Sequence, residues 1–405
     1  MKGRFVLAVA LCAAAALRGQ EAGQPELSPA NYLMNLGSGT ALNPLAWPMP
    51  MLMQRKGSWS LDYMGQVFLI DTQQSGPRGG DKLYSANWGM ASAQHSLGSG
   101  KIMFDAMLSL EPATVTRRSY PLLFQTGETA YGRPLTDAQH PHDFVMGLGA
   151  HYVRPVGEHT LLHFYYAAIG DPALGPVAFS HRASAQELPQ ATLGHHWEDS
   201  THIAANVATI GVKYRWIRLE ASGFHGGEPN ENRWNIDWGG MDSYSGRVSL
   251  FPSKNWTAQF SAGRLTKPES TEEGDVVRTT ASIHYTRVRF NGGAWSTSAI
   301  WGRNHNTASQ HDTNAWLLET VFPATGKDFL TGRFEVADKD ELLPQAFRVK
   351  AFTGGYTRDL VTHSNLETGI GANMTTYTIP TSVRPAYGNH PWGVSVYLRV
   401  RLKRS

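Results

Sequence analysis

Apolar and polar residues alternate along most of this chain, in stretches of about ten residues from residue 58 to the C-terminus. The stretch 392–402 shows the pattern clearly: valine and leucine occupy one set of alternate positions, and serine, tyrosine and arginine occupy the other. Successive side chains of a β-strand point to opposite faces, so a period of two predicts strands whose two faces meet different surroundings.

Sixteen stretches show this pattern, and we predict one strand for each. Boundaries assigned from sequence are uncertain by a few residues, so 14 or 18 strands are the neighbouring possibilities. The predicted strands cover residues 58–70, 83–96, 101–111, 143–154, 160–169, 202–213, 215–225, 242–251, 256–265, 277–287, 294–303, 313–322, 328–337, 346–357, 365–377 and 392–402.

The connections between these strands alternate in length. Short turns, for example 97–100 and 252–255, alternate with long connections, for example 112–142 and 170–201. Tight turns on one side and long loops on the other are typical of transmembrane β-barrels, whose closure removes edge strands. A soluble sandwich or propeller is the alternative, but a propeller would show a repeat of about 40–50 residues, and none is found. We therefore predict an all-β protein folded as a transmembrane antiparallel up-and-down β-barrel.

The hydropathy of the chain agrees with a barrel. Mean hydropathy is −0.32, and beyond the N-terminus no apolar run approaches the roughly 20 residues of a membrane-spanning helix. A barrel gives such values because only one face of each strand meets lipid. Aromatic residues near the predicted strand ends favour girdles at the two membrane surfaces: Trp59, Trp216, Trp256, Trp295, Trp316, Tyr377 and Trp392.

The N-terminus has the features of an export signal. Lys2 and Arg4 precede an apolar stretch, residues 5–17, that is too short to span a membrane. The only cysteine, Cys12, lies in this stretch, so the mature chain has no disulfide or thiolate metal site. We predict a signal peptide over residues 1–22 and the barrel over residues 58–405. Residues 23–57 form an irregular Met-containing segment that is either periplasmic or inside the barrel.

The net charge argues against one class of partner. The whole chain carries a charge of +3, and Lys2, Arg4 and Arg18 of the signal supply three of its positive charges. The mature barrel is therefore close to neutral. We predict no nucleic-acid partner, because such partners attract strongly basic surfaces.

The export signal, the alternating loop lengths and the final alternating strand resemble Gram-negative outer-membrane β-barrel proteins over essentially the whole mature chain. One difference is the C-terminus, which ends in serine where such proteins usually end in an aromatic residue. Residues 71–82 and 139–143 resemble, more narrowly, a family of uncharacterised outer-membrane proteins loosely associated with copper and heavy-metal efflux. The resemblance implies a Gram-negative outer-membrane location after signal cleavage, with outer-membrane lipid and the barrel-assembly machinery as partners.

Histidines gather at the ends of two long predicted loops. The group with its neighbouring aspartate comprises His140, His142, Asp143, His181, His195, His196 and His202. If these loops fold over one mouth of the barrel, imidazoles and carboxylates would converge on a site of three or four donors, which suits Cu(II), Zn, Ni or Fe. The spacing matches no defined metal motif, so the alternative is that these histidines pack the loops and hydrogen-bond to the backbone.

A methionine run precedes the first predicted strand. Met49, Met51 and Met53 alternate with other residues, and an extended chain would place all three sulfur atoms on one side. Thioethers select Cu(I), although a Met-rich apolar segment could also dock inside the barrel. Together with the histidines, this run favours copper as the bound metal.

The inward-facing positions of the strands are predicted to be polar and of mixed charge. The candidates are Asp105, Arg154, Arg218, Glu220, Arg247, Arg333, Glu335, Arg348, Lys350, Arg399 and Arg401. Arginines outnumber carboxylates, so a water-filled lumen would favour small anionic solutes. A barrel of 16 strands is wide enough for an aqueous channel. Loops or the N-terminal segment could fill it instead, and these side chains would then form a salt-bridge network.

The sequence gives little support for an enzyme. Ser282 with His284, or Ser200 with His202 and Asp199, supply the residue types of a hydrolase, but not the geometry on which such an assignment rests. We therefore predict a non-enzymatic outer-membrane pore or transport component for small solutes or metal ions. The alternative is a non-conducting barrel with a metal-binding, copper-handling or structural role.

Overall fold

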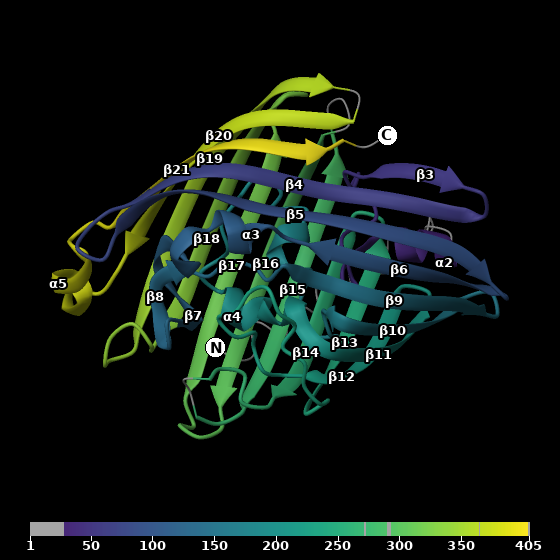
Figure 1. The fold of residues 1–405 in the computed structure, drawn as a ribbon, viewed down its shortest axis with the longest axis horizontal. Coiled ribbons are helices and arrows are strands. Elements are labelled where there is room, and N and C mark those ends of the chain that lie inside the picture. The colour runs from purple at the N-terminus through teal and green to yellow at the C-terminus, as the bar shows by residue number, and fades with distance from the viewer. Residues whose placement is uncertain (1–27, 271–272, 290–292, 364, 404–405) are drawn as a thin grey trace.

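The structure, a computed structural model, describes residues 28–403 except 271–272, 290–292 and 364. In this part of the chain, sixteen long antiparallel strands close into a barrel (Figure 1), which confirms the predicted fold class and strand count. The predicted signal peptide lies outside the described residues. The strands are β4 (Trp59–Gln74), β5 (Gly80–Leu97), β6 (Gly100–Leu108), β9 (Val145–Val156), β10 (Thr160–Gly170), β11 (Ala204–Tyr214), β12 (Ile217–His225), β13 (Ser243–Ser253), β14 (Trp256–Leu265), β15 (Val276–Val288), β16 (Ala294–Asn306), β17 (Asp312–Pro323), β18 (Asp328–Lys339), β19 (Phe347–His363), β20 (Leu366–Thr378) and β21 (Trp392–Leu402).

The ring closes between the first and the last of these strands. β21 pairs antiparallel with β4, with Gly393 opposite Gln74 at one end of the ladder. A short strand, β3 (Leu52–Lys56), pairs with β4 nearer the start of β4. It continues the ladder along β4 beyond the end of β21, so it is not counted as a further strand of the ring. Closure satisfies the backbone hydrogen bonds of the strands within the ring.

At two places the strands extend beyond their predicted ends. β4 continues to Gln74 and β5 begins at Gly80, so the connection between them shrinks to residues 75–79. β19 continues to His363. In both places the backbone ladder runs on after the apolar alternation has ended, because ladder hydrogen bonds join main-chain groups and do not require apolar side chains.

The outer face of the barrel is apolar. A soluble protein rarely exposes so many large apolar side chains, whereas a barrel in lipid presents such a band. No helix in the described part of the chain combines the length and apolarity needed to cross a membrane. The exposed outward-facing side chains include Val67, Leu69, Phe104, Leu108, Ile210, Leu219, Phe260, Leu318, Phe334, Phe352, Ile370, Val396 and Leu398.

Aromatic rings follow one another around the short-turn end of this outer face. Ring centroids are 4.6 Å apart for Trp256 and Tyr285, 5.6 Å for Tyr285 and Trp295, and 6.0 Å for Trp295 and Phe322. These residues lie on the consecutive strands β14 to β17, which supports an aromatic girdle at this end. Tyr377 does not belong to it, because its side chain is buried inside the barrel.

The segment before the barrel lies inside the ring, one of the two locations left open by the sequence. It is not irregular throughout, because it contains α2 (Pro29–Met34), β1 (Leu36–Ser38) and β2 (Ala41–Leu42). The hydroxyl of Tyr32 lies 2.7 Å from Nδ1 of His163, an inward residue of β10. Ala46 N donates a hydrogen bond to the carbonyl of Lys254, in the turn between β13 and β14. The segment therefore occupies the short-turn end of the lumen.

The long loops fold inward at the opposite end, and Figure 1 draws several of their elements within the outline of the ring. Their elements are α3 (Glu111–Thr114), the hairpin of β7 (Tyr120–Ala130) and β8 (Arg133–Gln139), α4 (His195–Glu198) and α5 (Arg384–Tyr387). A buried apolar cluster joins these loops to β17, β18, β19 and β20. It includes Leu123, Phe124, Leu193, Trp197, Ala315, Ala337, Phe347, Val349, Tyr377 and Tyr387.

Candidate functional site

Residues 171–203, between β10 and β11, cross the lumen, and we call them the plug loop. All of them are described, and none is exposed. Ala173 N donates to Oγ of Ser222 on β12 (2.8 Å), and Leu193 N donates to Oε1 of Glu335 on β18 (2.6 Å). β18 lies eight positions from β10 around the ring of sixteen strands. The plug loop therefore reaches the opposite wall.

One buried ion-pair network fixes the middle of the plug loop. Nε of Arg182 donates to Oε1 of Glu319 on β17 (2.6 Å), and Nη1 of Arg182 donates to Oδ2 of Asp199 (2.8 Å). Glu319 also pairs with Arg333 of β18 at 3.1 Å. Buried charges are tolerated when each has an oppositely charged, hydrogen-bonded partner. The plug loop and the wall thus compensate each other's charges.

A second network holds the plug loop to the last strand. The Glu187 carboxylate pairs with both Arg399 and Arg401 of β21, and the Arg401 Nη1 to Glu187 Oε1 distance is 2.8 Å. Arg401 also donates from Nε to Glu367 Oε2 at 2.6 Å. Glu187 and Arg399 are fully buried. A single carboxylate of the plug loop therefore bridges two arginines of the wall, which also pair with Asp359 and Glu367.

Most of the charged residues predicted to face the lumen do so. Those that the structure places on the inner face are Asp105, Arg218, Glu220, Arg247, Arg333, Glu335, Arg399 and Arg401. The prediction was wrong for three exposed residues on the outer face, namely Arg154, Arg348 and Lys350. Near these strand ends the inner face packs against buried segments and is apolar, as Val153 and Val349 show. The charges there lie on the outer side.

Five of the predicted histidines come together at the loop end of the barrel. Ring centroids are 6.1 Å apart for His140 and His196, 5.3 Å for His196 and His195, 5.3 Å for His195 and His202, and 5.6 Å for His202 and His142. Three of these residues belong to the plug loop, and two precede β9. The two loops thus converge, and we call the five residues the histidine cluster.

Carboxylates orient most of these imidazoles. The pairs are His195 Nδ1 with Asp199 Oδ1 (2.7 Å), His142 Nδ1 with Glu111 Oε2 (3.1 Å), His140 Nε2 with Glu128 Oε1 (3.1 Å), and His196 Nδ1 with Glu228 Oε1 (3.3 Å). Nε2 of His196 and Nε2 of His202 are buried without a hydrogen-bond partner among the described residues. An imidazole with one nitrogen held by a carboxylate and the other available is the usual arrangement of a metal ligand.

The pKa values of the histidines in the cluster are shifted in opposite directions. Burial opposes the charged form of His142, but the Glu111 carboxylate outweighs it and raises the pKa of His142 above its ordinary value. The same balance, with Glu228 as the partner, raises the pKa of His196. Burial lowers the pKa of His202 well below its ordinary range. The carboxylates thus favour the charged form of His142 and His196, whereas burial favours the neutral form of His202, and the neutral form is the one that binds metals.

His181 lies at the margin of this cluster. Its ring centroid is 4.5 Å from that of Trp88, and its Nε2 lies 3.1 Å from Sδ of Met107. Neither partner is a carboxylate. His181 thus packs the plug loop against the inner face of β5 and β6.

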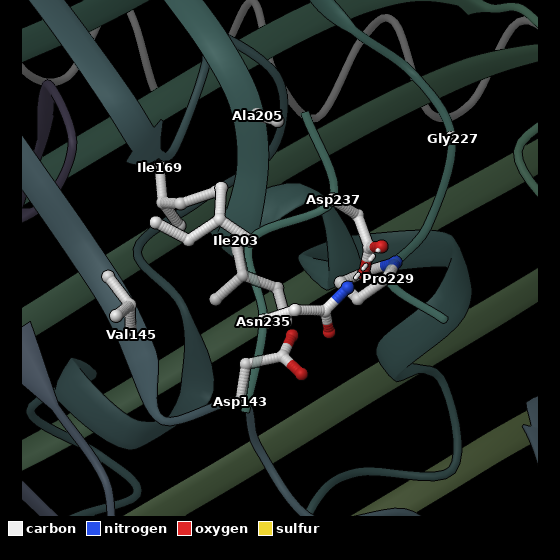
Figure 2. A pocket seen from close by; sticks show the side chains of 10 residues that line it. Asp143, Val145, Ile169, Ile203, Ala205, Gly227, Pro229, Asn235 and Asp237 are labelled. Atoms are coloured by element: carbon white, nitrogen blue, oxygen red, sulfur yellow. Dashed lines mark hydrogen bonds between the residues drawn. The ribbon is translucent and has the colours of Figure 1, made fainter. Parts of the chain in front are cut away.

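Asp143 lines a small cavity beside the cluster, together with Ile203, Asn235 and Asp237 (Figure 2). The cavity volume of about 10 Å³ leaves room for roughly one water molecule. Burial raises the pKa of Asp143 to about 7, although Arg233 lies 3.6 Å away. Asp143 is therefore next to the histidines without pairing with any of them.

The methionine run does not join the histidines. Met49 and Met51 are buried, whereas Met53 is 54% exposed. The expectation that all three sulfur atoms share one side is wrong, because β3 begins only at Leu52 and the chain before it is not a regular strand. β3 also lies at the short-turn end, opposite the histidine cluster. The two donor types cannot form one site in this arrangement.

The carboxylates that surround the histidines carry no recognisable signal in the sequence. Glu111 and Glu128 lie in the connection between β6 and β9, Glu228 lies between β12 and β13, and no spacing pattern relates them to His140 or His196. Pairing every loop histidine with every loop carboxylate would have included these three glutamates, but together with many carboxylates that do not contact a histidine. Only the folding of the loops selects these partners.

The residues considered for a hydrolase face the inside of the barrel. His284 lies 2.9 Å from Ser282 Oγ through Nε2 and 2.7 Å from Ser298 Oγ through Nδ1. Ser298 in turn contacts Ser184 of the plug loop. These groups are buried, and a hydroxyl stands where a hydrolase would place an orienting carboxylate or amide. The chain of hydrogen bonds ties the plug loop to β15 and β16.

The architecture can be compared with known proteins. No protein-family model matches the chain, and no curated protein matches it. Among solved structures, the anion-selective porin from Comamonas acidovorans matches with a TM-score of 0.54 at 11% identity, over 85% of this chain and 99% of the porin. The fold is porin-like. OmpF of Salmonella typhi, solved with daunomycin, matches with a TM-score of 0.53 at 8% identity, over 86% of this chain and 100% of OmpF. At such identities a shared fold does not transfer a function.

Proposed function

We propose that this porin-like protein is a barrel of the Gram-negative outer membrane whose lumen is blocked by its own plug loop and N-terminal segment. It is therefore not an open diffusion pore. The observation that carries the proposal is the plug loop, which is buried from one wall of the ring to the other. Its Arg182 and Glu187 are paired with charges of the wall, and the N-terminal segment occupies the other end of the lumen. Passage of a solute would require the plug loop to move.

The outer face supports the membrane location. Its exposed apolar band and its aromatic ring near the short turns have the pattern of outer-membrane barrels. In such a membrane the long loops would face outward and the N-terminal segment would face the periplasm. The proposal implies insertion by the barrel-assembly machinery and contact with outer-membrane lipid.

The closed lumen leads to a first prediction. We expect the full-length protein to produce no stepwise current when it is inserted in planar lipid bilayers, because the plug loop leaves no continuous aqueous path. The folded state can be checked by the heat-dependent shift in electrophoretic mobility that barrels show. Regular conductance steps from folded protein would contradict the proposal and favour the porin alternative.

We further infer that the histidine cluster binds a transition-metal ion, because five imidazoles converge beside carboxylates. Imidazole nitrogens and carboxylate oxygens suit Cu(II), Zn(II) and Ni(II). Copper in its Cu(I) form is less well matched, since the methionine run lies at the other end of the barrel. The proposed role is retention of a metal ion at the outer mouth, and we do not propose a hydrolase activity.

A second prediction tests this metal binding. The double substitution His195→Ala and His196→Ala should weaken binding of Cu(II) or Zn(II) at least about ten-fold, because it removes the centre of the cluster. Titration of refolded protein measures the affinity. The triple substitution of Met49, Met51 and Met53 by isoleucine is the control and should retain it. Equal affinity in the double variant and the unchanged protein would refute a role for the cluster.

A further inference from the structure

We propose that His196, Glu228 and Glu269 form the ligand set for a divalent metal ion that links the plug loop to two neighbouring loops. This inference rests on the proposed metal binding and specifies which residues perform it. One donor atom from each side chain lies within 4.8 Å of the donors of the other two. Two of the three ligands are carboxylates that the histidine pattern of the sequence does not include.

The three residues come from separate parts of the chain. His196 lies on α4 of the plug loop, Glu228 lies between β12 and β13, and Glu269 lies between β14 and β15. His196 is buried, and both carboxylates are partly buried. Nδ1 of His196 is 3.3 Å from Oε1 of Glu228. The fold therefore brings three loops to one point.

A second observation points to a missing ligand. Nε2 of His196 and Oε2 of Glu228 are buried and lack a hydrogen-bond partner among the described residues. His196 is only 4% exposed. A buried polar atom without a partner costs free energy, and native proteins usually satisfy such atoms with water, an ion or another ligand. A cation between the donors would satisfy these groups.

The charge of the site is suited to a cation. Glu228 and Glu269 contribute two carboxylates, and the guanidinium of Arg278 interacts electrostatically with both. The hydrogen bonds of Arg278, however, go to Oγ of Ser200 (2.8 Å) and Oδ1 of Asn304 (3.0 Å). One arginine does not neutralise two carboxylates, so a net negative charge remains at the site when His196 is in the neutral, metal-binding form.

The donor set defines the class of metal. One imidazole nitrogen and two carboxylate oxygens suit borderline divalent ions such as Zn(II), with water completing the coordination. A tetrahedral zinc ion holds its donors roughly 3.4 Å apart, since Zn–N and Zn–O bonds are about 2.0–2.2 Å. The carboxylates would therefore need to close by about 1 Å or a little more, which rotation of a partly exposed glutamate side chain provides.

A bound ion would have a structural consequence. α4 lies against β15, β16 and β17, so His196 is anchored to the wall. An ion that joins this residue to Glu228 and Glu269 would fasten the plug loop to the loops on either side of β13 and β14. Metal binding would then stabilise the closed form of the barrel.

The test is titration of refolded full-length protein with Zn(II). Glu228→Gln and Glu269→Gln should each weaken Zn(II) binding by at least about ten-fold, because substitutions even beyond the direct ligands typically cost 10–100-fold in affinity. Glu273→Gln is the matched control, since Glu273 is an exposed glutamate of the same loop as Glu269, and it should bind as the unchanged protein does. Zn(II) should also raise the thermal unfolding midpoint of the unchanged protein, but not of the two ligand variants.

The outcomes separate this inference from the proposed metal binding. If the His195/His196 double variant loses Zn(II) binding while Glu228→Gln and Glu269→Gln retain it, this ligand set is wrong and the histidine cluster still stands. If the unchanged protein does not bind Zn(II) or Cu(II), both are wrong. Loss in the two glutamine variants and retention in Glu273→Gln supports the site. Before each titration, the folded state of each variant is checked by its heat-dependent electrophoretic mobility. A loss of binding therefore cannot result from misfolding.

Discussion

Replacing the plug loop, residues 171–203, with a tight turn should convert the closed barrel into a conducting channel. Gly170 and Ala204 face each other in the ladder of β10 and β11, so a two-residue hairpin turn can join the two strands directly. A ring of sixteen strands is wide enough for water once its contents are removed. The buried arginines of the wall would then face water, so removal of their partners should not prevent folding.

The expected result is discrete current steps in planar bilayers, where we expect none from the unchanged protein. The steps should favour anions, because removal of Glu187 leaves Arg399 and Arg401 of the wall with one carboxylate partner fewer. A variant that also lacks residues 29–51 should conduct more, since that segment fills the short-turn end. A variant lacking residues 29–51 alone is the matched control and should remain silent. A folded double variant without conductance would show that the plug loop does not close the lumen.

Glu187→Gln in the plug loop should strongly destabilise the folded barrel. It removes the carboxylate that Arg399 and Arg401 share, and both arginines are buried, so two positive charges are left with only Asp359 and Glu367 as carboxylate partners. Breaking one side of a buried ion pair typically costs about 3–5 kcal/mol, because the remaining charge stays uncompensated. We expect a loss of this size in the free energy of unfolding, measured by urea titration with tryptophan fluorescence.

The matched control is Asp312→Asn. Asp312 also pairs with an arginine, Arg303, but both side chains are well exposed, and exposed pairs contribute at most about 1 kcal/mol. If water entered the lumen around Arg399 and Arg401 in the Glu187 variant, its stability would fall less, but the loosened plug loop would then give intermittent current. A Glu187→Gln protein as stable and as silent as the unchanged one would refute the role given to this network.

The strands were predictable because their pattern is local. A period of two over about ten residues reports that one face meets an apolar solvent and the other does not, and Val394, Val396 and Leu398 of β21 show this directly. The alternating loop lengths gave the antiparallel order. The errors occurred at strand ends, as with Arg348 and Lys350, where the inner face packs against buried loops and the usual polarity of the two faces is reversed.

The candidate site was predictable only in part. The histidines could be identified from their concentration in two loops, and their convergence followed if those loops shared one mouth of the barrel. Their partners could not be identified, because Glu228 and Glu269 meet His196 through three loops whose mutual arrangement no local pattern specifies. The methionine run failed as a ligand set for a related reason: the chain before β3 is not extended.

The sequence by itself determined the fold class of this protein, a closed antiparallel barrel with an apolar outer face. It could do so because every strand that faces lipid needs an apolar residue at every second position. Only the tertiary structure decided that the barrel is filled. The filling depends on contacts such as Glu187 with Arg399, which lie far apart in the chain and carry no periodic signal. The same holds for the proposed metal site, since His196, Glu228 and Glu269 are brought together by the folding of loops within the ring.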